Sequence, residues 1–319
     1  MRKIKKLSVV IPCHNEQEVL AATCSRLSSV LDQLCASGKI SDYELIFVDN
    51  GSTDNTLDAL KKILEGNKKL KIVSLRRNFG YQGSISAGLN YADGDAAVTI
   101  DADLQDPPEK IGEMVDFFEQ GYDLVLGIRQ DRLSDSFLKR FFSEGYYKFL
   151  KLIGAEVVYN HGDFRLMSKS LVQEFNMLQE RNRFIRAMVL QLESRYAKVF
   201  YSRLPRTAGK SKFNINSLFS LGLDGVLSFS YVPLRLASLV GIILCFFSML
   251  GAGWVFYIKI KTSVMPGWAS TLLPILGLGG FQLLMLGLIG EYIGRLYLEV
   301  KARPLFIIRE IYTSGNNDK

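Results

Sequence analysis

The stretch Ala96-Ala-Val-Thr-Ile-Asp-Ala-Asp103 decides the fold. Its first five residues form a short apolar run with β-branched side chains, which predicts a buried strand. Two carboxylates, Asp101 and Asp103, follow directly and are therefore expected at the carboxyl end of that strand. Carboxylates one residue apart can hold a hard divalent cation. A polar turn has the same pattern, so the surrounding chain must decide between the two interpretations.

Outward from this stretch, predicted strands and helices alternate. Besides 96–100, we expect strands at 7–12, 43–49, 71–75 and 123–126. The segments between them predict helices over about 15–37, about 52–64, where Ser52 or Asp54 can cap the helix, and about 82–91. Alternation of this kind is typical of an α/β fold: a Rossmann-like, mainly parallel sheet with helices on both faces. In such sheets ligands bind outside the carboxyl ends of the strands.

Three more polar motifs follow predicted strands, at residues 12–16 (PCHNE), 48–54 (VDNGSTD) and 76–80 (RRNFG). In the first, a backbone turn and the carboxylate of Glu16 can grip a nucleoside. In the second, Asp49 can accept a hydrogen bond from a base N–H or a sugar hydroxyl. Each motif alone fits ordinary turn chemistry. Four of them at one sheet edge favour a nucleotide-binding crevice.

The last third of the chain is strongly apolar. Residues 236–258 and 268–290 contain no charged side chain, and about 20 apolar residues suffice to cross the hydrocarbon core of a bilayer. We therefore predict a two-helix transmembrane hairpin; a pair of buried core helices is the alternative. Basic residues flank its outer ends, so the positive-inside rule predicts a multi-pass protein of the inner (plasma) membrane with the N-terminal α/β domain and both termini cytoplasmic.

The predicted organisation has four parts: a cytoplasmic α/β domain over 1–213, interfacial amphipathic helices over 214–234, two transmembrane helices over 235–291 and a cytoplasmic tail over 292–319. The formal charge of +7 suits an anionic lipid or a polyanionic substrate. Nucleic acid is not expected as a partner, because no compact Lys/Arg run with interleaved aromatic residues occurs.

Together these motifs resemble the family 2 glycosyltransferases with the GT-A fold, and more closely the polyprenyl-phosphate glycosyltransferases: dolichyl-phosphate mannose synthase and the bactoprenol glucosyltransferases. The resemblance extends over nearly the whole chain. The segments that carry it are IPCHNE, VDNGSTDNT, RNFGYQGSISAG, DADLQDPPE, GDFRLM, AGKSK and GEYIGRLYLEVKARP. It implies inverting transfer of a sugar from a nucleotide sugar to polyprenyl phosphate, with Mg²⁺ or Mn²⁺ as cofactor and a homotetrameric assembly. Glucose, UDP and undecaprenyl phosphate are the default choices; N-acetylglucosamine, galactose, mannose and formyl-aminoarabinose stay open.

The resemblance also implies roles for individual residues. The nucleotide-sugar contacts would be Pro12, Asn15, Glu16, Asp49, Ser52, Asp101, Gln105 and Arg129. The metal ligands would be Asp101, Asp103 and Gln105, and the catalytic residues Asp163, Asp103 and Arg165. The acceptor phosphate would be bound by Arg129, Arg165, Arg206, Ser211 and Lys212. A phosphate monoester is largely dianionic at neutral pH, so Asp163 is expected to act as an orienting residue or a weak base. Neither histidine, His14 nor His161, is assigned a catalytic role.

Two positions depart from the family pattern. Asn50 stands where a second aspartate is frequent, and Lys210 precedes Ser211 where an acidic residue is frequent. Two other functions were weighed. A processive polysaccharide synthase would need more membrane spans and a QxxRW motif, and the sequence has neither. A non-catalytic membrane scaffold is disfavoured, because the pair Asp101 and Asp103 is intact and Asp163, Arg165 and Lys212 are in place.

Overall fold

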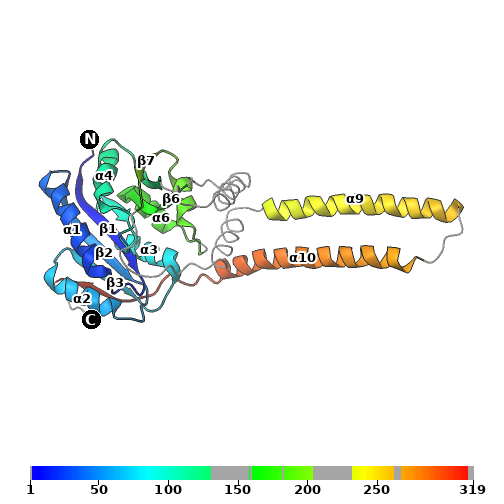
Figure 1. Cartoon of the computed structure of the whole chain (residues 1–319), viewed down its shortest axis with the longest axis horizontal. Helices are drawn as coiled ribbons and strands as arrows, with labels where there is room; N and C mark the ends of the chain where they lie inside the picture. Colours follow the sequence, from blue (N-terminus) through cyan, green and yellow to red (C-terminus); the bar gives the residue numbers. More distant parts are fainter. Residues whose placement is uncertain are drawn as a thin grey trace. The chain divides into compact units, whose positions relative to one another are not determined.

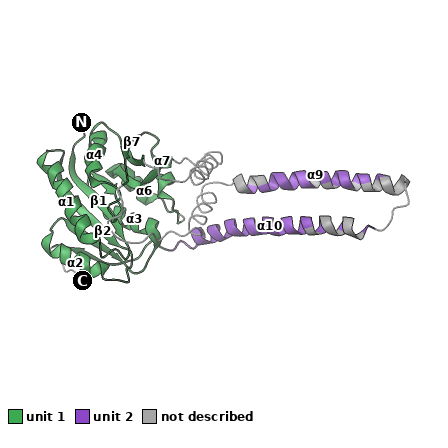
Figure 2. Cartoon of the chain, in the orientation of Figure 1, with its two compact units in different colours: residues 1–215, 304–319 green, residues 216–303 purple. Residues whose placement is uncertain are grey.

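The computed structural model describes residues 2–130, 158, 160–181, 183–203, 232–261 and 267–314. The chain forms two compact units, Met1–Ile215 with Pro304–Lys319 and Asn216–Arg303 (Figure 2). Several predicted features lie outside the described residues. They are Arg206, Ser211 and Lys212, together with the amphipathic helices predicted over 214–234 except for residues 232–234. The four-part division predicted from the sequence stays a prediction.

All five predicted strands are present in the first unit: β1 (Ile4–Cys13), β2 (Ile40–Asp49), β3 (Leu70–Leu75), β4 (Ala96–Thr99) and β5 (Leu124–Arg129). β1 pairs in parallel with both β2 and β4, and β2 pairs in parallel with β3. The carboxyl ends of these four strands therefore meet at one edge of the sheet, where the four polar motifs follow (Figure 1).

Three further strands make the sheet mixed: β6 (His161–Ser168), β7 (Tyr196–Tyr201) and β8 (Ile308–Thr313). The order across the sheet is β7-β5-β6-β4-β1-β2-β3-β8. β6 lies antiparallel between β4 and β5, and its register sets Thr99 opposite Arg165. Because β4 and β6 run in opposite directions, Asp163 lies beside the end of β4 that leads to Asp101.

Helices cover both faces of the sheet, as predicted. α1 (Leu20–Ala36), α2 (Thr56–Gly66) and α4 (Ile111–Glu119) share one buried cluster with Leu7, Val9 and Ile11 of β1. Successive strand residues point to opposite faces, and Val10 accordingly meets α3 (Gly80–Asn90) on the other side. A Cβ added to Gly88 would lie 2.2 Å from Val10 Cγ1, so α3 packs directly on β1. α6 (Lys169–Met177) and α7 (Ile185–Leu192) follow β6.

The second unit consists of α9 (Val232–Lys261) and α10 (Trp268–Val300). Large apolar side chains are exposed along both helices, among them Ile242, Met249 and Leu283. Over the part of the chain that the structure describes, no helix combines the length and the apolar character needed to cross a membrane. The transmembrane hairpin therefore stays a prediction. After α10 the chain rejoins the first unit at Pro304 and forms β8 there.

Candidate active site

The loop after β1 is bonded to the loop after β2. Asn15, at a left-handed φ of 55°, donates its backbone N–H to Ser52 Oγ (3.1 Å) and accepts a hydrogen bond from Thr53 N at Oδ1 (2.8 Å). The backbone N–H of Glu16 donates to Thr56 Oγ1 (2.9 Å). The two motifs predicted to contact the nucleoside thus form one rigid unit. The buried Pro12 precedes this unit within β1.

Asp49, at the end of β2, is almost fully buried. Its Oδ1 accepts a hydrogen bond from Ser52 N (3.0 Å) and its Oδ2 accepts one from Ser74 Oγ (3.1 Å). The carboxylate therefore ties the loop after β2 to β3. Its predicted contact with a nucleoside stays a prediction.

Asn50 is one of the two departures from the family pattern. Both the nitrogen and the oxygen of its side-chain amide form hydrogen bonds. Nδ2 donates to Asn78 Oδ1 and to Gly80 O (both 3.1 Å), while Oδ1 accepts from Phe79 N (2.9 Å). An aspartate could accept the last bond but could not donate the first two. This chain therefore needs an amide here to hold the loop after β3 against the loop after β2.

Two backbone positions beside the site have a positive φ. Gly51 has φ 61°, and a Cβ there would lie 2.3 Å from the carbonyl carbon of Arg77, so only glycine fits. Leu104, directly after the acidic pair, has φ 54°. A leucine in this region is strained, and such strain is concentrated at functional sites. The chain turns sharply where Asp101 and Asp103 are presented.

Asp101 lies among other carboxylates. Tyr81, at the start of α3, donates its hydroxyl to Asp101 Oδ1 (2.5 Å). Burial, followed by the charges of Asp106 and Asp163, raises the pKa of Asp101 to about 7. The site therefore carries more negative charge than its side chains neutralise at this point.

Asp103 and Gln105 follow in the same turn. Asp103 Oδ1 accepts a hydrogen bond from the backbone N–H of Gln105 (3.2 Å), and the Gln105 side chain is buried. Within the described ranges, no three His, Cys, Asp or Glu side chains come together as a ready-made metal site. Any cation held at Asp101 and Asp103 would take the rest of its ligands from elsewhere.

Asp106 holds Arg129 in place. No role for Asp106 was predicted from the sequence. The fully buried Asp106 accepts hydrogen bonds at Oδ1 from the Tyr201 hydroxyl (2.7 Å) and from Arg129 Nη2 (3.5 Å). Arg129 Nε donates to the same Tyr201 oxygen (3.1 Å). Gly162 leaves room for this guanidinium, since a Cβ there would lie 2.9 Å from Arg129 Nη2.

Asp163 is bound by two arginines. Its Oδ1 accepts a hydrogen bond from Arg165 Nη2 (2.5 Å). Arg186, in the first turn of α7, donates from Nη2 to Oδ2 (2.6 Å) and from Nε to Oδ1 (3.3 Å). Burial opposes ionisation of Asp163, but the charges of Arg186 and Arg165 outweigh it and hold the pKa of this carboxyl well below its usual range. Arg186 was not among the site residues predicted from the sequence. The only signal there is an arginine inside a short apolar helix.

His161 and Arg165 carry buried polar atoms that have no hydrogen-bond partner among the described residues. These atoms are both ring nitrogens of His161 and Nε and Nη1 of Arg165. Burial, together with the charges of Arg165 and Arg186, lowers the pKa of His161 well below its usual value. The imidazole is therefore neutral at physiological pH.

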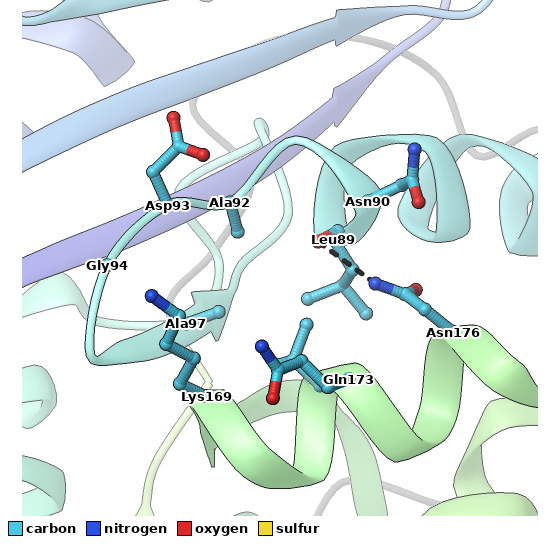
Figure 3. Close-up of a pocket in the computed structure, with 10 residues that line it drawn as sticks. Leu89, Asn90, Ala92, Asp93, Gly94, Ala97, Lys169, Gln173 and Asn176 are labelled. Carbon is cyan, nitrogen blue, oxygen red and sulfur yellow. Dashed lines mark hydrogen bonds between the residues drawn. The ribbon is translucent and has the colours of Figure 1, made fainter.

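A separate hollow of about 230 Å³ lies at the other end of β4, beside Ala97 (Figure 3). α6 and the end of α3 form its walls, and Asn176 Nδ2 donates to Leu89 O (3.4 Å) across it. Lys169 and Asp93 also line it. None of the predicted site residues that the structure describes lines it.

The sheet and the acidic turn that follows β4 define a GT-A type α/β protein. The model of the family Glycosyl transferase family 2 matches residues 8–175. The chain belongs to this family and is a glycosyltransferase.

Curated relatives match along nearly the whole chain. An uncharacterized glycosyltransferase of Synechocystis is 41% identical over 309 residues, covering 96% of each chain. A prophage-derived bactoprenol glucosyl transferase of Shigella flexneri is 37% identical over 310 residues, covering 96% of this chain and 98% of the relative. Among solved structures, glucosyl-3-phosphoglycerate synthase of Mycobacterium tuberculosis with Mn²⁺ and UDP-glucose is 19% identical, with a TM-score of 0.44 over 70% of this chain and 78% of that one. Similarity at that structural level does not bear on the ligands of the present chain.

Proposed function

We propose that the chain transfers a sugar from a nucleoside-diphosphate donor to a polyprenyl phosphate, giving a lipid-linked sugar. The bactoprenol glucosyl transferases that match over nearly their full length support this acceptor class. Glucose from UDP-glucose and undecaprenyl phosphate are the preferred substrates. Choice of sugar depends on a few hydrogen bonds in the pocket, so N-acetylglucosamine, galactose, mannose and formyl-aminoarabinose are the competing donors to test.

The observation that carries the proposal is the meeting of two charged groups at the ends of β4 and β6. One is the acidic pair Asp101 and Asp103, and the other is Asp163 with its two arginines. The acidic pair suits a cation bound to the donor, and the arginine-rich group suits a phosphate. Transfer between a nucleotide sugar and a phosphate acceptor needs both side by side.

Asp101, Asp103 and Gln105 are the residues that would hold Mg²⁺ or Mn²⁺. Burial, and after it the charges of Asp106 and Asp163, raises the pKa of Asp101, and a bound divalent cation would favour the charged carboxylate again. Mg²⁺ is usually bound by one or two carboxylates together with substrate phosphates and water, so two carboxylates are a fitting set. When bound, the ion would neutralise the diphosphate leaving group.

Asp163 acts in this proposal as an orienting residue and not as a base. A carboxylate bound by two guanidinium groups is a poor proton acceptor at neutral pH, and a phosphate monoester needs little deprotonation there. Positioning and charge stabilisation then supply the catalysis. Attack from the face opposite the diphosphate inverts the anomeric centre, as the family does.

The enzyme would act at the inner membrane, where its lipid acceptor resides. The exposed apolar side chains of α9 and α10 and the two charge-free stretches over 236–258 and 268–290 support a membrane hairpin with both termini in the cytoplasm. Arg206, Ser211 and Lys212 would add positive charge for the diphosphate and the lipid phosphate. A homo-oligomer, tetrameric by resemblance, completes the proposal.

Transfer of a radiolabelled sugar tests this function. Membranes containing the enzyme are supplied with UDP-[¹⁴C]glucose, with or without added undecaprenyl phosphate, and label is counted in the organic phase. We expect lipid-soluble label that depends on the added acceptor, that EDTA abolishes, and that Mg²⁺ or Mn²⁺ restores. Asp103→Ala should lower transfer by at least a hundredfold, because the main metal ligand is lost.

The competing donors serve as parallel arms of the same assay. Label in the lipid fraction from another nucleotide sugar would reassign the sugar and keep the reaction. Label in a long polymer would point to a processive synthase, and no turnover of any donor would point to a scaffold. Wild-type transfer by a folded Asp103→Ala enzyme would contradict the metal assignment.

A further inference from the structure

We infer that Arg186 binds the phosphate of the acceptor and that Asp163 is the positioning residue that holds its guanidinium ready. The inference rests on the proposed function and deepens it, since it names a residue of the acceptor site that the sequence motifs leave out. It begins with the way α7 presents this side chain.

α7 is anchored so that Arg186 has little freedom. Its residues Ile185, Met188 and Val189 are fully buried, and Ile185 N donates to Gln82 Oε1 (3.4 Å), which ties the helix to α3. Arg186 lies within this first turn, and two of its nitrogens donate to Asp163. A planar guanidinium in a two-bond contact with a carboxylate has a defined orientation.

The two arginines at Asp163 differ in their exposure to an incoming ligand. The side chain of Arg165 is 0% exposed, whereas that of Arg186 is 29% exposed. Arg165 therefore lies behind the carboxylate, and Arg186 lies at the surface of the group. A ligand that arrives from solvent meets Arg186 first.

Formal charges divide the site into an acidic half and a basic half. Asp106 is paired with Arg129, and Asp163 is paired with both Arg165 and Arg186. The group at Asp163 thus joins two guanidinium groups to one carboxylate, while Asp101 and Asp103 form the acidic half. A divalent cation and its diphosphate belong with the acidic half. The dianionic phosphate of the acceptor belongs with the basic half.

The buried polar atoms that lack hydrogen-bond partners in the described ranges also lie in the basic half of the site. Arg165 Nε and Nη1 and both ring nitrogens of His161 lack hydrogen-bond partners among the described residues, and both side chains are more than nine-tenths buried. Leaving such groups unpaired is costly, and most buried polar groups in proteins are paired. Phosphate oxygens accept hydrogen bonds, so they suit the two Arg165 nitrogens that lack an acceptor in the described part of the chain.

Variants of the full-length enzyme in detergent test the inference: Arg186→Ala, Arg186→Lys and, as a matched control, Arg2→Ala. Arg2 also donates to an aspartate, Asp123 (2.6 Å), but at an exposed position at the opposite end of β5. For Arg186→Ala we expect KM for polyprenyl phosphate to rise about 10- to 100-fold, as loss of a charged hydrogen bond does, with KM for the nucleotide sugar changed less than threefold. Arg186→Lys should recover part of the loss, and Arg2→Ala should match wild type.

A binding measurement separates this inference from the proposed function. Farnesyl phosphate, a short soluble probe, is titrated without donor while Tm is followed; UDP-glucose with Mg²⁺ serves as the folding control. We expect farnesyl phosphate to stabilise wild type but not Arg186→Ala, while the donor stabilises both. Equal stabilisation of both proteins by farnesyl phosphate, or an equal rise of both KM values, would overturn the role of Arg186 and leave the function intact. If farnesyl phosphate and undecaprenyl phosphate both fail to bind wild type, the proposed acceptor itself is wrong.

Discussion

At the scale of single residues, two neighbouring carboxylates of the site differ in the charges that surround them. Asp101 and Asp163 lie at the ends of adjacent antiparallel strands, yet their pKa values move in opposite directions. Asp101 is crowded by other carboxylates, whereas Asp163 is enclosed by two guanidinium groups. The first is ready for a cation, and the second is already neutralised.

The crowding at Asp101 has a measurable cost in stability. Its pKa in the folded protein, about 7, lies above the ordinary value of 3.8. Between these two values the folded state binds more protons than the unfolded state, so stability falls as the pH rises through this window. In metal-free enzyme, Asp101→Asn should remove that cost and raise the stability at pH 8, by up to about 4 kcal/mol. The gain should shrink toward zero near pH 4.

Thermal unfolding in EDTA at several pH values measures this effect. Glu65→Gln is the control, because Glu65 is an exposed carboxylate on α2, outside the site. Its Tm should follow that of wild type at every pH. An Asp101→Asn protein whose advantage is the same at pH 5 and pH 8 would show that the raised pKa of Asp101 is not the cause.

The residue scale also explains why Arg186 escaped sequence reasoning. Its partner Asp163 is 23 positions earlier, on a strand, while Arg186 itself is on a helix. No local pattern joins the two positions. Asn50, by contrast, was noticed as a departure, but its reason became visible only in its bonds to Asn78 and Gly80.

At the scale of elements, the strands that were predicted differ in kind from those that were not. Each of the strands β1 to β4 contains an apolar run that is buried on both faces, and such runs can be recognised in a sequence. β6 contains Asp163 and Arg165, whose charges a sequence reader takes as a sign of a loop. In the fold these two charges pair with each other, and the strand is buried along its whole length.

β8 was missed for a different reason. It follows a long apolar helix and was assigned to a cytoplasmic tail, yet it pairs antiparallel with β3 from Lys71 to Leu75. Ile307 O also accepts a hydrogen bond from Arg76 N (2.9 Å), and Tyr312 packs against the core. The segment thus covers the edge of the sheet next to the loop that follows β3.

Removal of β8 should therefore weaken the first unit. A chain that ends at Pro304 leaves β3 as an unpaired edge, and unpaired edges promote aggregation. We expect its Tm to fall by about 5–10 °C and its elution from size exclusion to shift toward aggregates. A chain that ends at Ser314 keeps β8 and should match wild type. Equal Tm values for the two truncations would show that β8 contributes nothing to the sheet.

At the scale of the whole molecule, the membrane proposal predicts which side of the bilayer each segment faces. In a version without its native cysteines, Val264→Cys lies between the two charge-free stretches and Ser314→Cys lies just after β8. A membrane-impermeant maleimide added to spheroplasts should label the first cysteine. It should label the second only after the membrane is opened, because the positive-inside rule keeps this end in the cytoplasm.

The untreated and opened samples provide the contrast for each position. Labelling of both cysteines in intact spheroplasts, or of neither, would rule out a hairpin with cytoplasmic termini. Enzyme that an alkaline carbonate wash removes from the membrane pellet would rule out a membrane-spanning pair of helices.

The place of β8 in the chain also affects how the enzyme is made. A ribosome translates β3 early and β8 only after both long helices, although the two strands pair in the finished sheet. The first unit therefore keeps β3 as an unpaired edge of its sheet until both helices have been synthesised. Completion of this sheet is thereby delayed until the segment proposed for the bilayer has been synthesised, and a chain that ends within α10 lacks one strand of the sheet.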